Sequence, residues 1–525
     1  MNLNTRNKII FIILTILVSI LGGYCIFRAT TLGPWAFSDS AAYLSAARNI
    51  QGGNGATILN SNGSFTPVTE FPPLFPVILS LFTPHEGDFL TTARWINVIF
   101  FTLSIFIVGL LSFRAFNNLL PSLFSSLLFA VSPLMVDTFS GFMSEPLFIG
   151  LLLLLVFLLF EFINSKKTLF LIPIFIISSF LPMVRYAGIL FVFCISICFY
   201  IFRKMNSQGI FRLIPPYILV SLAPIGIWFI NQFNNLNKVG GKRLVLNGNF
   251  VKNIFQNILQ EFKVIEGWIP YSGIYSNKII NQTILFSFSG LFIFSLFIGL
   301  SVSIKNRNTN NHKSLLLFQI CLILFSAYIL FIGFTRSFTI PSIDIIDRMM
   351  APIYPFLVLI FLWAFEFLLI ERSRWFLGSI LIFIALISIR FYGLSAYNSV
   401  EELHAEGKGY SSREYRQSEL LAKLNSLPLN QPLISNSAAF VLFYTNRFPL
   451  PVDQFHNRSY GSGNAYGEKT FRERNAALVI LIPEFNNYYG ETSDQLFQSL
   501  TAGLRVDFLD EIGGIFYYPI KPIPQ

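Results

Sequence analysis

The chain has 525 residues, of which 54% are hydrophobic and only 12% charged, and its mean hydropathy is +0.61. Soluble domains carry about 25% charged residues, so the composition excludes an ordinary water-soluble enzyme. The formal net charge of +10 does not indicate a nucleic-acid partner, because the basic residues lie in short segments between apolar runs.

Apolar segments long enough to cross a bilayer recur along most of the chain. The block 168–202 is divided into two spans because Pro182 and Arg185 interrupt it. The first run also fits a signal peptide, but its length and the lack of a small-residue cleavage site favour an uncleaved span. We therefore predict an all-α polytopic membrane protein with about eleven transmembrane helices, at residues 9–27, 95–113, 119–137, 146–163, 168–182, 187–202, 213–231, 283–304, 314–334, 350–370 and 375–392.

The basic residues support one orientation of these spans. With the N-terminus in the cytoplasm, nearly every short basic loop falls on the cytoplasmic side, as the positive-inside rule requires. This orientation puts three long polar segments outside, at residues 28–92, 232–282 and 393–525. We expect a multi-pass protein of a cell inner or plasma membrane, with an extracytoplasmic C-terminal region.

The polar C-terminal region has the composition of a small soluble domain. Short buried strands are predicted at PLISNS, AALVILIP and GGIFYYPI, with a helix at AAFVLFYTN between the first two. Alternating strands and helices predict a small α/β fold. The expected organisation is a transmembrane module at 1–392, which includes the external loop 28–92, followed by an extracytoplasmic α/β domain at 393–525.

The first external loop carries the main candidate for a catalytic base. Asp39 begins a stretch of helical character that contains Tyr43, and Pro72 and Pro73 open a second amphipathic piece. Two short helices on the membrane surface fit this pattern. A carboxylate just above the bilayer is well placed to act on a lipid head group. Asp39 equally fits a plain helix-capping or solvated residue.

The second external turn, VDTFSGFMSEPLF, has an acidic residue at each edge, Asp137 and Glu145. The turn is short, so we expect Glu145 at the same depth as Asp39. Two carboxylates on one face fit a shared divalent metal, or a division into base and orienting roles. Solvated helix ends are the alternative. Nothing else indicates a metal, because the four histidines lack ligand spacing and the four cysteines lie in apolar stretches.

Two arginines at the external ends of predicted spans are candidates for phosphate binding. Arg185 interrupts an apolar block, where a guanidinium is costly and usually faces a cavity or a partner. Arg348 lies at the mouth of the span expected at 350–370, and its planar fork suits a phosphate. An ion pair with Asp344 or Asp347 is the competing interpretation for Arg348.

These residues, in this order and with this sidedness, resemble the C-type (GT-C) membrane glycosyltransferases. More narrowly, they resemble the bacterial branch related to protein O-mannosyltransferases and to the aminoarabinose transferase that acts on lipid A. The resemblance extends from the first external loop to the last predicted spans. It is carried by Asp39 with Tyr43, Gly52 to Gly55, Pro72-Pro73-Leu74 with Pro76, Ala93-Arg94, Ser144-Glu145, Arg185-Tyr186-Ala187-Gly188, and Arg348 with Pro352 and Pro355.

The chain departs from the family pattern at two points. Many relatives carry a basic residue just before Pro-Pro-Leu, where this chain has Phe71 preceded by Glu70. Many relatives also use Asp at the second acidic site, where this chain has Glu145. The first departure removes an expected contact to the donor phosphate, and the second leaves the orienting or metal role open.

The resemblance implies an inverting hexosyl- or pentosyltransferase. It would move a sugar from a polyprenyl-phosphate donor to a hydroxyl of a lipid, glycan or protein at the external leaflet. Asp39 would be the base, and Arg185 and Arg348 would stabilise the lipid phosphate. Glu145, with Asp137, would orient groups or hold a divalent metal, and no other cofactor is implied. The expected partners are the donor, membrane lipid and the acceptor.

Two other classes of protein share some of these features. A transporter or flippase for lipid-linked glycans also has many spans, but its charged residues usually lie near the bilayer midplane. Here they cluster at the external boundary. A polymerase or ligase that joins preassembled glycans shares the donor class. The alternatives differ from the transferase in their need for Asp39 as a base.

Overall fold

The structure is a computed structural model that describes residues 5–59, 64–204, 210–236, 243–244, 250–269, 312–340, 345–370, 375–452 and 475–517. The chain forms two compact units. A helical unit comprises Met1–Ala29, Thr69–Phe75 and Arg94–Glu402, and a mixed unit comprises Thr30–Val68, Pro76–Ala93 and Leu403–Gln525. The first external loop of the sequence is therefore shared between the units.

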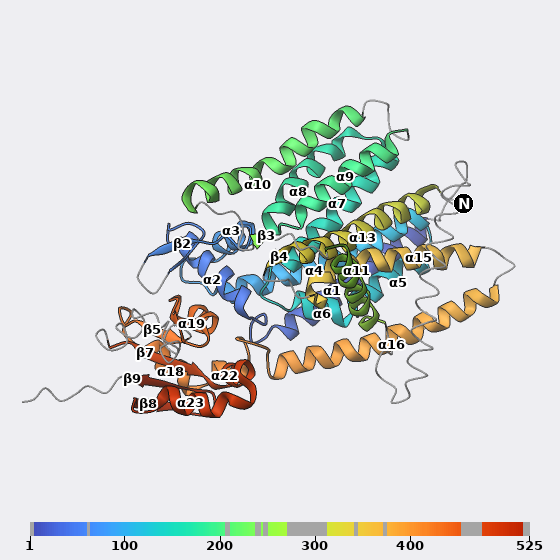
Figure 1. Ribbon diagram of the computed structural model, residues 1–525. Helices are drawn as coiled ribbons and strands as arrows, with labels where there is room; N and C mark the ends of the chain where they lie inside the picture. The colour runs from blue at the N-terminus through green and yellow to red at the C-terminus, as the bar shows by residue number, and fades with distance from the viewer. Residues whose placement is uncertain are drawn as a thin grey trace, which may run out of the picture. The chain divides into compact units, whose positions relative to one another are not determined.

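The described part of the helical unit consists almost entirely of helices (Figure 1). Short 3₁₀ segments at 168–170, 202–204, 210–213 and 351–353 flank several of them, and strands β3 (Arg243–Leu244) and β4 (Thr339–Ile340) pair antiparallel. The helices are α1 (Thr5–Ala29), α4 (Phe89–Phe116), α5 (Leu119–Ala130), α6 (Pro133–Phe139), α7 (Glu145–Ser165), α8 (Leu171–Val184), α9 (Gly188–Ile201), α10 (Ile214–Leu236), α11 (Phe250–Gly267), α13 (His312–Phe338), α14 (Asp347–Met350), α15 (Tyr354–Ile370) and α16 (Trp375–Ala405).

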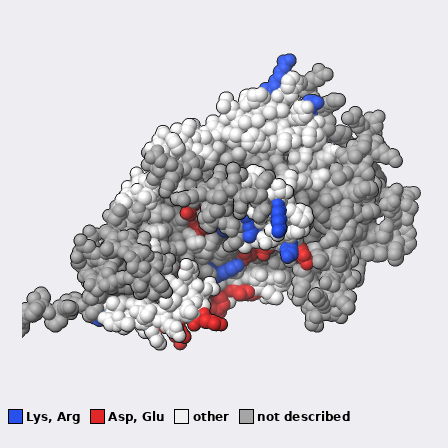
Figure 2. All heavy atoms as spheres, viewed as in Figure 1, with Lys and Arg blue, Asp and Glu red and all other residues white. Residues whose placement is uncertain are grey.

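These helices have the surface of a membrane protein. Five described helices are long and apolar enough to cross a bilayer, or six if α5 and α6, which meet at a bend of 54°, form one span. Helix α1 leaves Ile13, Leu17 and Leu21 half exposed or more, which is unfavourable in water and favourable in lipid. Most of the described surface seen in Figure 2 carries no charged side chain. The prediction of a polytopic membrane fold is confirmed.

The predicted spans fall on described helices, with one outside the described residues. That span is 283–304. The segment predicted at 119–137 is the bent pair α5 and α6, where Pro133 begins the second helix. The last helix of the helical unit, α16, runs on to Ala405, past residue 392, the predicted end of the membrane module. No proline interrupts the chain there, so the helix continues beyond its apolar part.

The division of residues 168–202 into two helices is confirmed. Helix α9 runs parallel to α7, because Phe191 packs near Phe148 at the start of α7 and Phe199 near Phe162 at its end. Helix α8 follows α7 along the chain and packs on it, so the chain must reverse between α8 and α9. In Figure 1 these helices lie side by side with α10. The reversal preserves the alternation on which the predicted sidedness depends.

Two bidentate ion pairs join helices of this unit. Arg114 of α4 donates to both carboxylate oxygens of Glu161 in α7, at 2.7 and 2.5 Å. Arg28 of α1 makes the same arrangement with Glu401 of α16, at 2.8 Å for each bond. Planar fork-to-carboxylate pairing is geometrically specific, so each pair fixes the register of two helices.

The mixed unit combines a helix-rich N-terminal part with a sheet. Its helices are α2 (Ser38–Gln51), α3 (Leu74–Phe82, shared with the helical unit), α17 (Arg413–Arg416), α18 (Glu419–Ser426), α19 (Ala438–Thr445), α22 (Ile482–Tyr489) and α23 (Ser493–Thr501). Strands β1 (Thr57–Leu59) and β2 (Phe65–Pro67) form an antiparallel hairpin. The main sheet has the order β6-β5-β7-β9-β8, from β5 (Leu433–Ser435), β6 (Leu450–Pro451), β7 (Ala477–Leu481), β8 (Arg505–Leu509) and β9 (Gly513–Tyr517).

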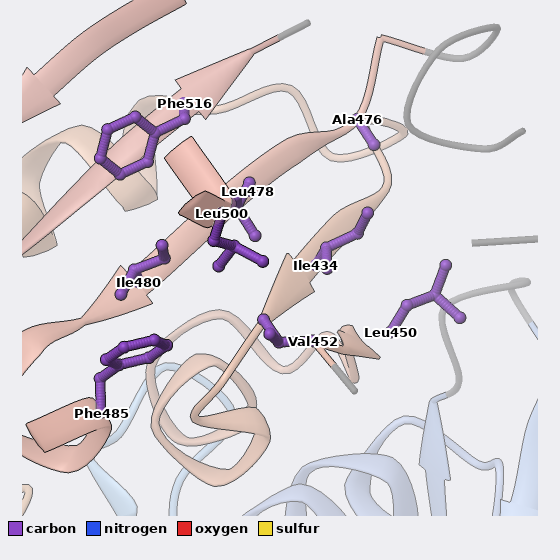
Figure 3. Packing of buried hydrophobic residues seen from close by; sticks show 9 residues of the cluster. All are labelled: Ile434, Leu450, Val452, Ala476, Leu478, Ile480, Phe485, Leu500 and Phe516. Atoms are coloured by element: carbon purple, nitrogen blue, oxygen red, sulfur yellow. The ribbon is translucent and has the colours of Figure 1, made fainter. Parts of the chain in front are cut away.

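The sheet is parallel at one side and antiparallel at the other. Strands β6, β5 and β7 are parallel, whereas β9 runs antiparallel to both β7 and β8. Apolar side chains from the four strands β5, β6, β7 and β9 pack with side chains of helices α22 and α23 (Figure 3). The cluster includes Ile434, Leu478, Ile480, Phe485, Leu500 and Phe516. The three strands and the helix predicted for this region, and hence its α/β character, are confirmed.

Candidate functional site

The carboxylate of Glu145 lies at the start of helix α7. Ser144 is the N-cap and Glu145 the first helical residue, followed by Pro146, a residue favoured in the first turn. A carboxylate here is stabilised by the positive end of the helix dipole. The Glu145 residue is only 1% exposed. A charge so thoroughly buried requires compensating partners.

The first partner, Arg185, lies in the turn between α8 and α9. Its backbone is extended, with φ −147° and ψ 138°, so the α8 helix ends there. Gly188 allows the tight reversal, because a Cβ at this position would lie 2.3 Å from the carbonyl carbon of Leu181. Nη1 of Arg185 lies 2.6 Å from Oε1 of Glu145 and 3.3 Å from the hydroxyl of Ser144.

The second partner, Arg348, lies in the short helix α14. Its Nε is 3.6 Å from Oε1 of Glu145, a distance for an ion pair without a direct hydrogen bond. The neighbouring Asp347 instead accepts a hydrogen bond from the indole of Trp268, at 2.8 Å. The other carboxylate considered for Arg348, Asp344, lies outside the described residues.

Each of the two guanidinium groups also contacts a thioether sulfur. Nη1 of Arg348 is 3.4 Å from the sulfur of Met143, and Nη2 of Arg185 is 3.8 Å from that of Met349. A thioether is a weak acceptor, whereas phosphate oxygens are strong acceptors for a guanidinium. The arginine side chains keep 18% and 20% exposure while the shared carboxylate has 1%. An anion that approaches this cluster would gain stronger hydrogen bonds than the sulfurs supply.

The turn that carries Arg348 is itself held in place. The hydroxyl of Tyr328, on α13, donates to the carbonyl of Met349 at 2.6 Å. The Tyr328 residue is 1% exposed, and its side chain interacts electrostatically with Arg185 and Glu145. Sequence reasoning missed Tyr328, Met143 and Met349. The sequence indicated the surroundings of the two arginines only indirectly, because a guanidinium at the end of an apolar span needs an anion nearby.

Asp137 is the other predicted acidic residue of this turn. It lies in the last turn of α6, half-buried, and α6 contacts both α7 and α14. The described residues contain no group of three or more His, Cys, Asp or Glu that could hold a metal ion. Glu145 faces two cations, and these would have to move before its carboxylate could bind a third. A metal role for Glu145 and Asp137 stays a prediction.

The segment Thr69–Phe75 is the part of the first loop that belongs to the helical unit. Its two predicted prolines, Pro72 and Pro73, are both buried. The ring of Phe75 packs against Phe142, with centroids 6.0 Å apart. Phe142 directly precedes the Met143-Ser144-Glu145 turn. The segment therefore packs against the same turn that leads into the cluster of Glu145, Arg185 and Arg348, which we call the arginine cluster.

Asp39 and Tyr43 belong to the mixed unit. Asp39 is the second residue of α2, half-buried, where the helix dipole favours a carboxylate. Tyr43 follows one turn later and is 3% exposed. The helix ends at Gly52, followed by Gly53 at φ +79°, as the glycine-rich sequence predicts.

The structure brings Glu145, Arg185 and Arg348 together within the helical unit.

Helix α2 is supported by the C-terminal part of its own unit. It packs on α19, and Nη1 of Arg48 donates to the carbonyl of Phe443 at 2.9 Å. Burial lowers the pKa of Arg48 from its ordinary value. At a second junction, Gly409, with φ +59°, lies so close to Ala36 that a Cβ would be 2.1 Å from the Ala36 carbonyl oxygen. The Asp39-bearing helix is thus part of the same folded body as residues 403–452.

Comparison with known proteins gives a clear result at the level of structure. No family model matches the sequence, and no curated protein matches it either. Solved structures with the same architecture include ArnT from Cupriavidus metallidurans bound to undecaprenyl phosphate, and the same protein in the apo state. Each is 12% identical to this chain, with a TM-score of 0.57 and 98% of both chains covered. ArnT is the lipid A aminoarabinose transferase, so the resemblance read from the motifs is confirmed for the fold, and this chain has the GT-C fold.

Proposed function

We propose that this protein is an inverting membrane glycosyltransferase that uses a polyprenyl-phosphate-linked sugar as donor. The observation that carries the proposal is the pair of arginines around one buried carboxylate, Glu145. Two planar guanidinium groups at one place suit a phosphate group, which takes several charge-assisted hydrogen bonds. The similarity to ArnT, whose crystal structure holds undecaprenyl phosphate, supports a polyprenyl phosphate as the anion.

The proposed chemistry is a direct displacement at the anomeric carbon. The acceptor oxygen forms a bond to that carbon while the bond to the donor phosphate oxygen breaks. The electron pair leaves with the phosphate, so a donor with one negative charge becomes a polyprenyl phosphate with two. Arg185 and Arg348 would therefore bind the transition state more tightly than the donor, which is what accelerates a reaction.

Asp39 is the proposed base. It would take the proton of the acceptor hydroxyl as that oxygen attacks. A single base with no covalent intermediate predicts inversion at the anomeric carbon. The acceptor would be a hydroxyl of a lipid, a glycan or a protein. We place the reaction at the external face of an inner or plasma membrane, in keeping with the positive-inside pattern of the loops.

The test is transfer of radiolabelled sugar from a panel of polyprenyl-phosphate donors by the full-length protein in lipid. Wild type would be compared with Asp39→Asn and with Asp494→Asn. Asp494 is a matched control, because it is also the second residue of a helix, α23, and it is exposed. We expect loss of transfer by a factor of about 100 or more only for Asp39→Asn, because general base catalysis supplies about 10²–10⁴-fold.

Three results would contradict the proposal. Equal transfer by Asp39→Asn and wild type would remove Asp39 from the mechanism. Retention of configuration in the product would exclude the single displacement. Absence of transfer from every donor, with lipid-linked glycan crossing the bilayer in a leaflet assay, would favour a flippase instead.

A further inference from the structure

Two adjacent side chains in the turn between α8 and α9 lead to different parts of the helical unit. Arg185 reaches the carboxylate of Glu145 at 2.6 Å. The hydroxyl of the next residue, Tyr186, donates a hydrogen bond to the carbonyl of Thr69 at 2.9 Å. The chemistry proposed above makes no use of Tyr186. Its contact nevertheless joins the cluster-bearing turn to a loop residue 117 positions away.

The residue that Tyr186 holds is the first of the segment Thr69–Phe75. At the other end of the segment, Phe75 is 0% exposed and packs on Phe142. Residues 69–73 belong to no helix or strand, so no regular backbone hydrogen bonding fixes their path. The Tyr186 hydrogen bond and the packing of Phe75 on Phe142 are contacts that hold the segment at its two ends.

Both anchors of the segment are neighbours of the arginine cluster along the chain. Tyr186 follows Arg185 directly, and Phe142 directly precedes Met143, whose sulfur contacts Arg348. The turn that carries Arg185 and the turn that leads into Glu145 thus also hold the segment. The segment Thr69–Phe75 is therefore held next to Arg185 and Glu145, where the donor phosphate would bind.

The ring of Tyr186 is held independently of its hydroxyl. It packs on Phe229 of α10, with ring centroids 5.5 Å apart. The hydroxyl also interacts with the side chains of Trp228 and Gln232, and Gln232 is 3% exposed. Replacing tyrosine by phenylalanine would keep the ring packing and remove only the polar contacts. The substitution therefore tests the polar contacts of the hydroxyl, to Thr69 and to α10, apart from the packing of the ring.

We propose that Tyr186 is a positioning residue that fixes the segment Thr69–Phe75 in its place beside the arginine cluster. It touches no reacting atom and acts through Thr69 and the two prolines that follow. That the segment is positioned for donor binding rests on the proposed function. That Tyr186 positions the segment does not, and the two statements have separate tests.

The first test measures the segment directly, without any reaction. A reporter cysteine at the half-buried position Phe71 would be labelled with a maleimide in full-length protein in lipid, in a background with alanine at the native cysteines. Tyr186→Phe is compared with Tyr217→Phe, whose hydroxyl donates to Ser178 at 2.7 Å and which is fully buried in the same unit. We expect labelling to become about 5-fold faster in Tyr186→Phe alone, as loss of one hydrogen bond predicts. Equal labelling rates in both variants would overturn the proposal. The native cysteines are Cys25, Cys194, Cys198 and Cys321.

The second test separates KM from kcat in the sugar-transfer assay. We expect Tyr186→Phe to raise KM for the polyprenyl-phosphate donor about 5-fold and to change kcat less than about 2-fold. A fall in kcat with unchanged KM would overturn the donor-binding part of the proposal. If wild type transfers no sugar, the proposed function fails, and the labelling experiment alone decides whether Tyr186 positions the segment.

Discussion

Oε1 of Glu145 lies 2.6 Å from Nη1 of Arg185, and the two residues occupy two points where the chain enters or leaves a helix. Glu145 starts α7, and Arg185 terminates α8. The ion pair therefore fixes two turns relative to each other, with Arg348 drawn to the same carboxylate oxygen at 3.6 Å. Loss of the carboxylate would leave two partly buried positive charges without their shared partner.

Glu145→Gln should destabilise the protein strongly. Breaking one side of a buried ion pair costs about 3–5 kcal/mol, and the lower part of that range applies because the arginines keep some exposure. The measurement is the thermal unfolding midpoint of the purified protein in one lipid composition. Glu401→Gln is the control, since its pair with Arg28 is 33–39% exposed and an exposed ion pair contributes little to stability. Similar shifts for the two variants would contradict a buried structural role for Glu145.

Arg348→Lys should weaken donor binding while preserving the charge. Lysine replaces a planar fork by a point charge, so a bidentate contact to phosphate becomes a single one. One hydrogen bond to a charged group is worth about 1.5–3 kcal/mol, so we expect KM for the donor to rise about 10- to 100-fold. The control is Arg203→Lys, because Arg203 lies over the ring of Tyr200 and donates to its carbonyl. Equal KM values for Arg348→Lys and wild type would remove Arg348 from the phosphate site.

Gly188→Ala should prevent the close approach of α8 and α9. The added methyl would lie 2.3 Å from the carbonyl carbon of Leu181 and 2.4 Å from the nitrogen of Pro182, both backbone atoms that cannot turn aside. Overpacking of this kind costs about 1–3 kcal/mol or more. Gly226→Ala, in helix α10, has nothing within 4 Å and should stabilise by about 0.5–1 kcal/mol. Opposite signs of the two shifts in unfolding midpoint are expected, and equal shifts would argue against a tight turn.

Glu261→Gln should stabilise the protein at high pH only. Glu261 of α11 is 0% exposed, and neither of its oxygens has a hydrogen-bond partner among the described residues. Burial raises the pKa of Glu261 to about 8, against an opposing effect of Arg336. Between an ordinary pKa of 4.5 and this value, the folded state binds the proton that the unfolded state releases. Stability therefore falls as pH rises through that window.

The glutamine variant mimics the neutral acid. Its unfolding midpoint should match that of wild type near pH 4.5 and exceed it near pH 8. The corresponding difference in the free energy of unfolding is at most a few kcal/mol. The measurement is the difference in midpoint between the two proteins across that pH range. A difference that does not change with pH would show that the carboxylate is not protonated on burial.

The predictable parts of the fold are those with local patterns. Apolar runs predict the spans, and Pro182 with Arg185 predicts the reversal between α8 and α9. Three strands of the main sheet have apolar sequences and were predicted. Strand β8 was missed because its side chains are mostly exposed, and β6 because it has two residues. Neither offers the alternation or apolar run on which a strand prediction depends.

The arrangement of the site could be predicted only in part. The sequence identified Glu145, Arg185 and Arg348 as separate candidates, from charge at the ends of apolar spans. It did not predict that both arginines approach the same carboxylate oxygen of Glu145. The three residues are brought together by the packing of α7, α8 and α14. Met143 and Met349 carry no charge signal at all. Asp39, Asp137 and the metal role stay predictions, for which mutants are the test.

The mixed unit also has a consequence for how the protein is made. Arg48 and its partner Phe443 are 395 residues apart, and Phe448 donates its N–H to Leu59 across a similar interval. Helix α2 emerges early from the ribosome, yet its support is synthesised last. The packing of α2 is therefore completed only after helix α19 (Ala438–Thr445) has been synthesised, later than all the membrane helices. A nascent chain that ends before residue 443 would contain all of its membrane helices but would lack the residues of α19 on which α2 packs.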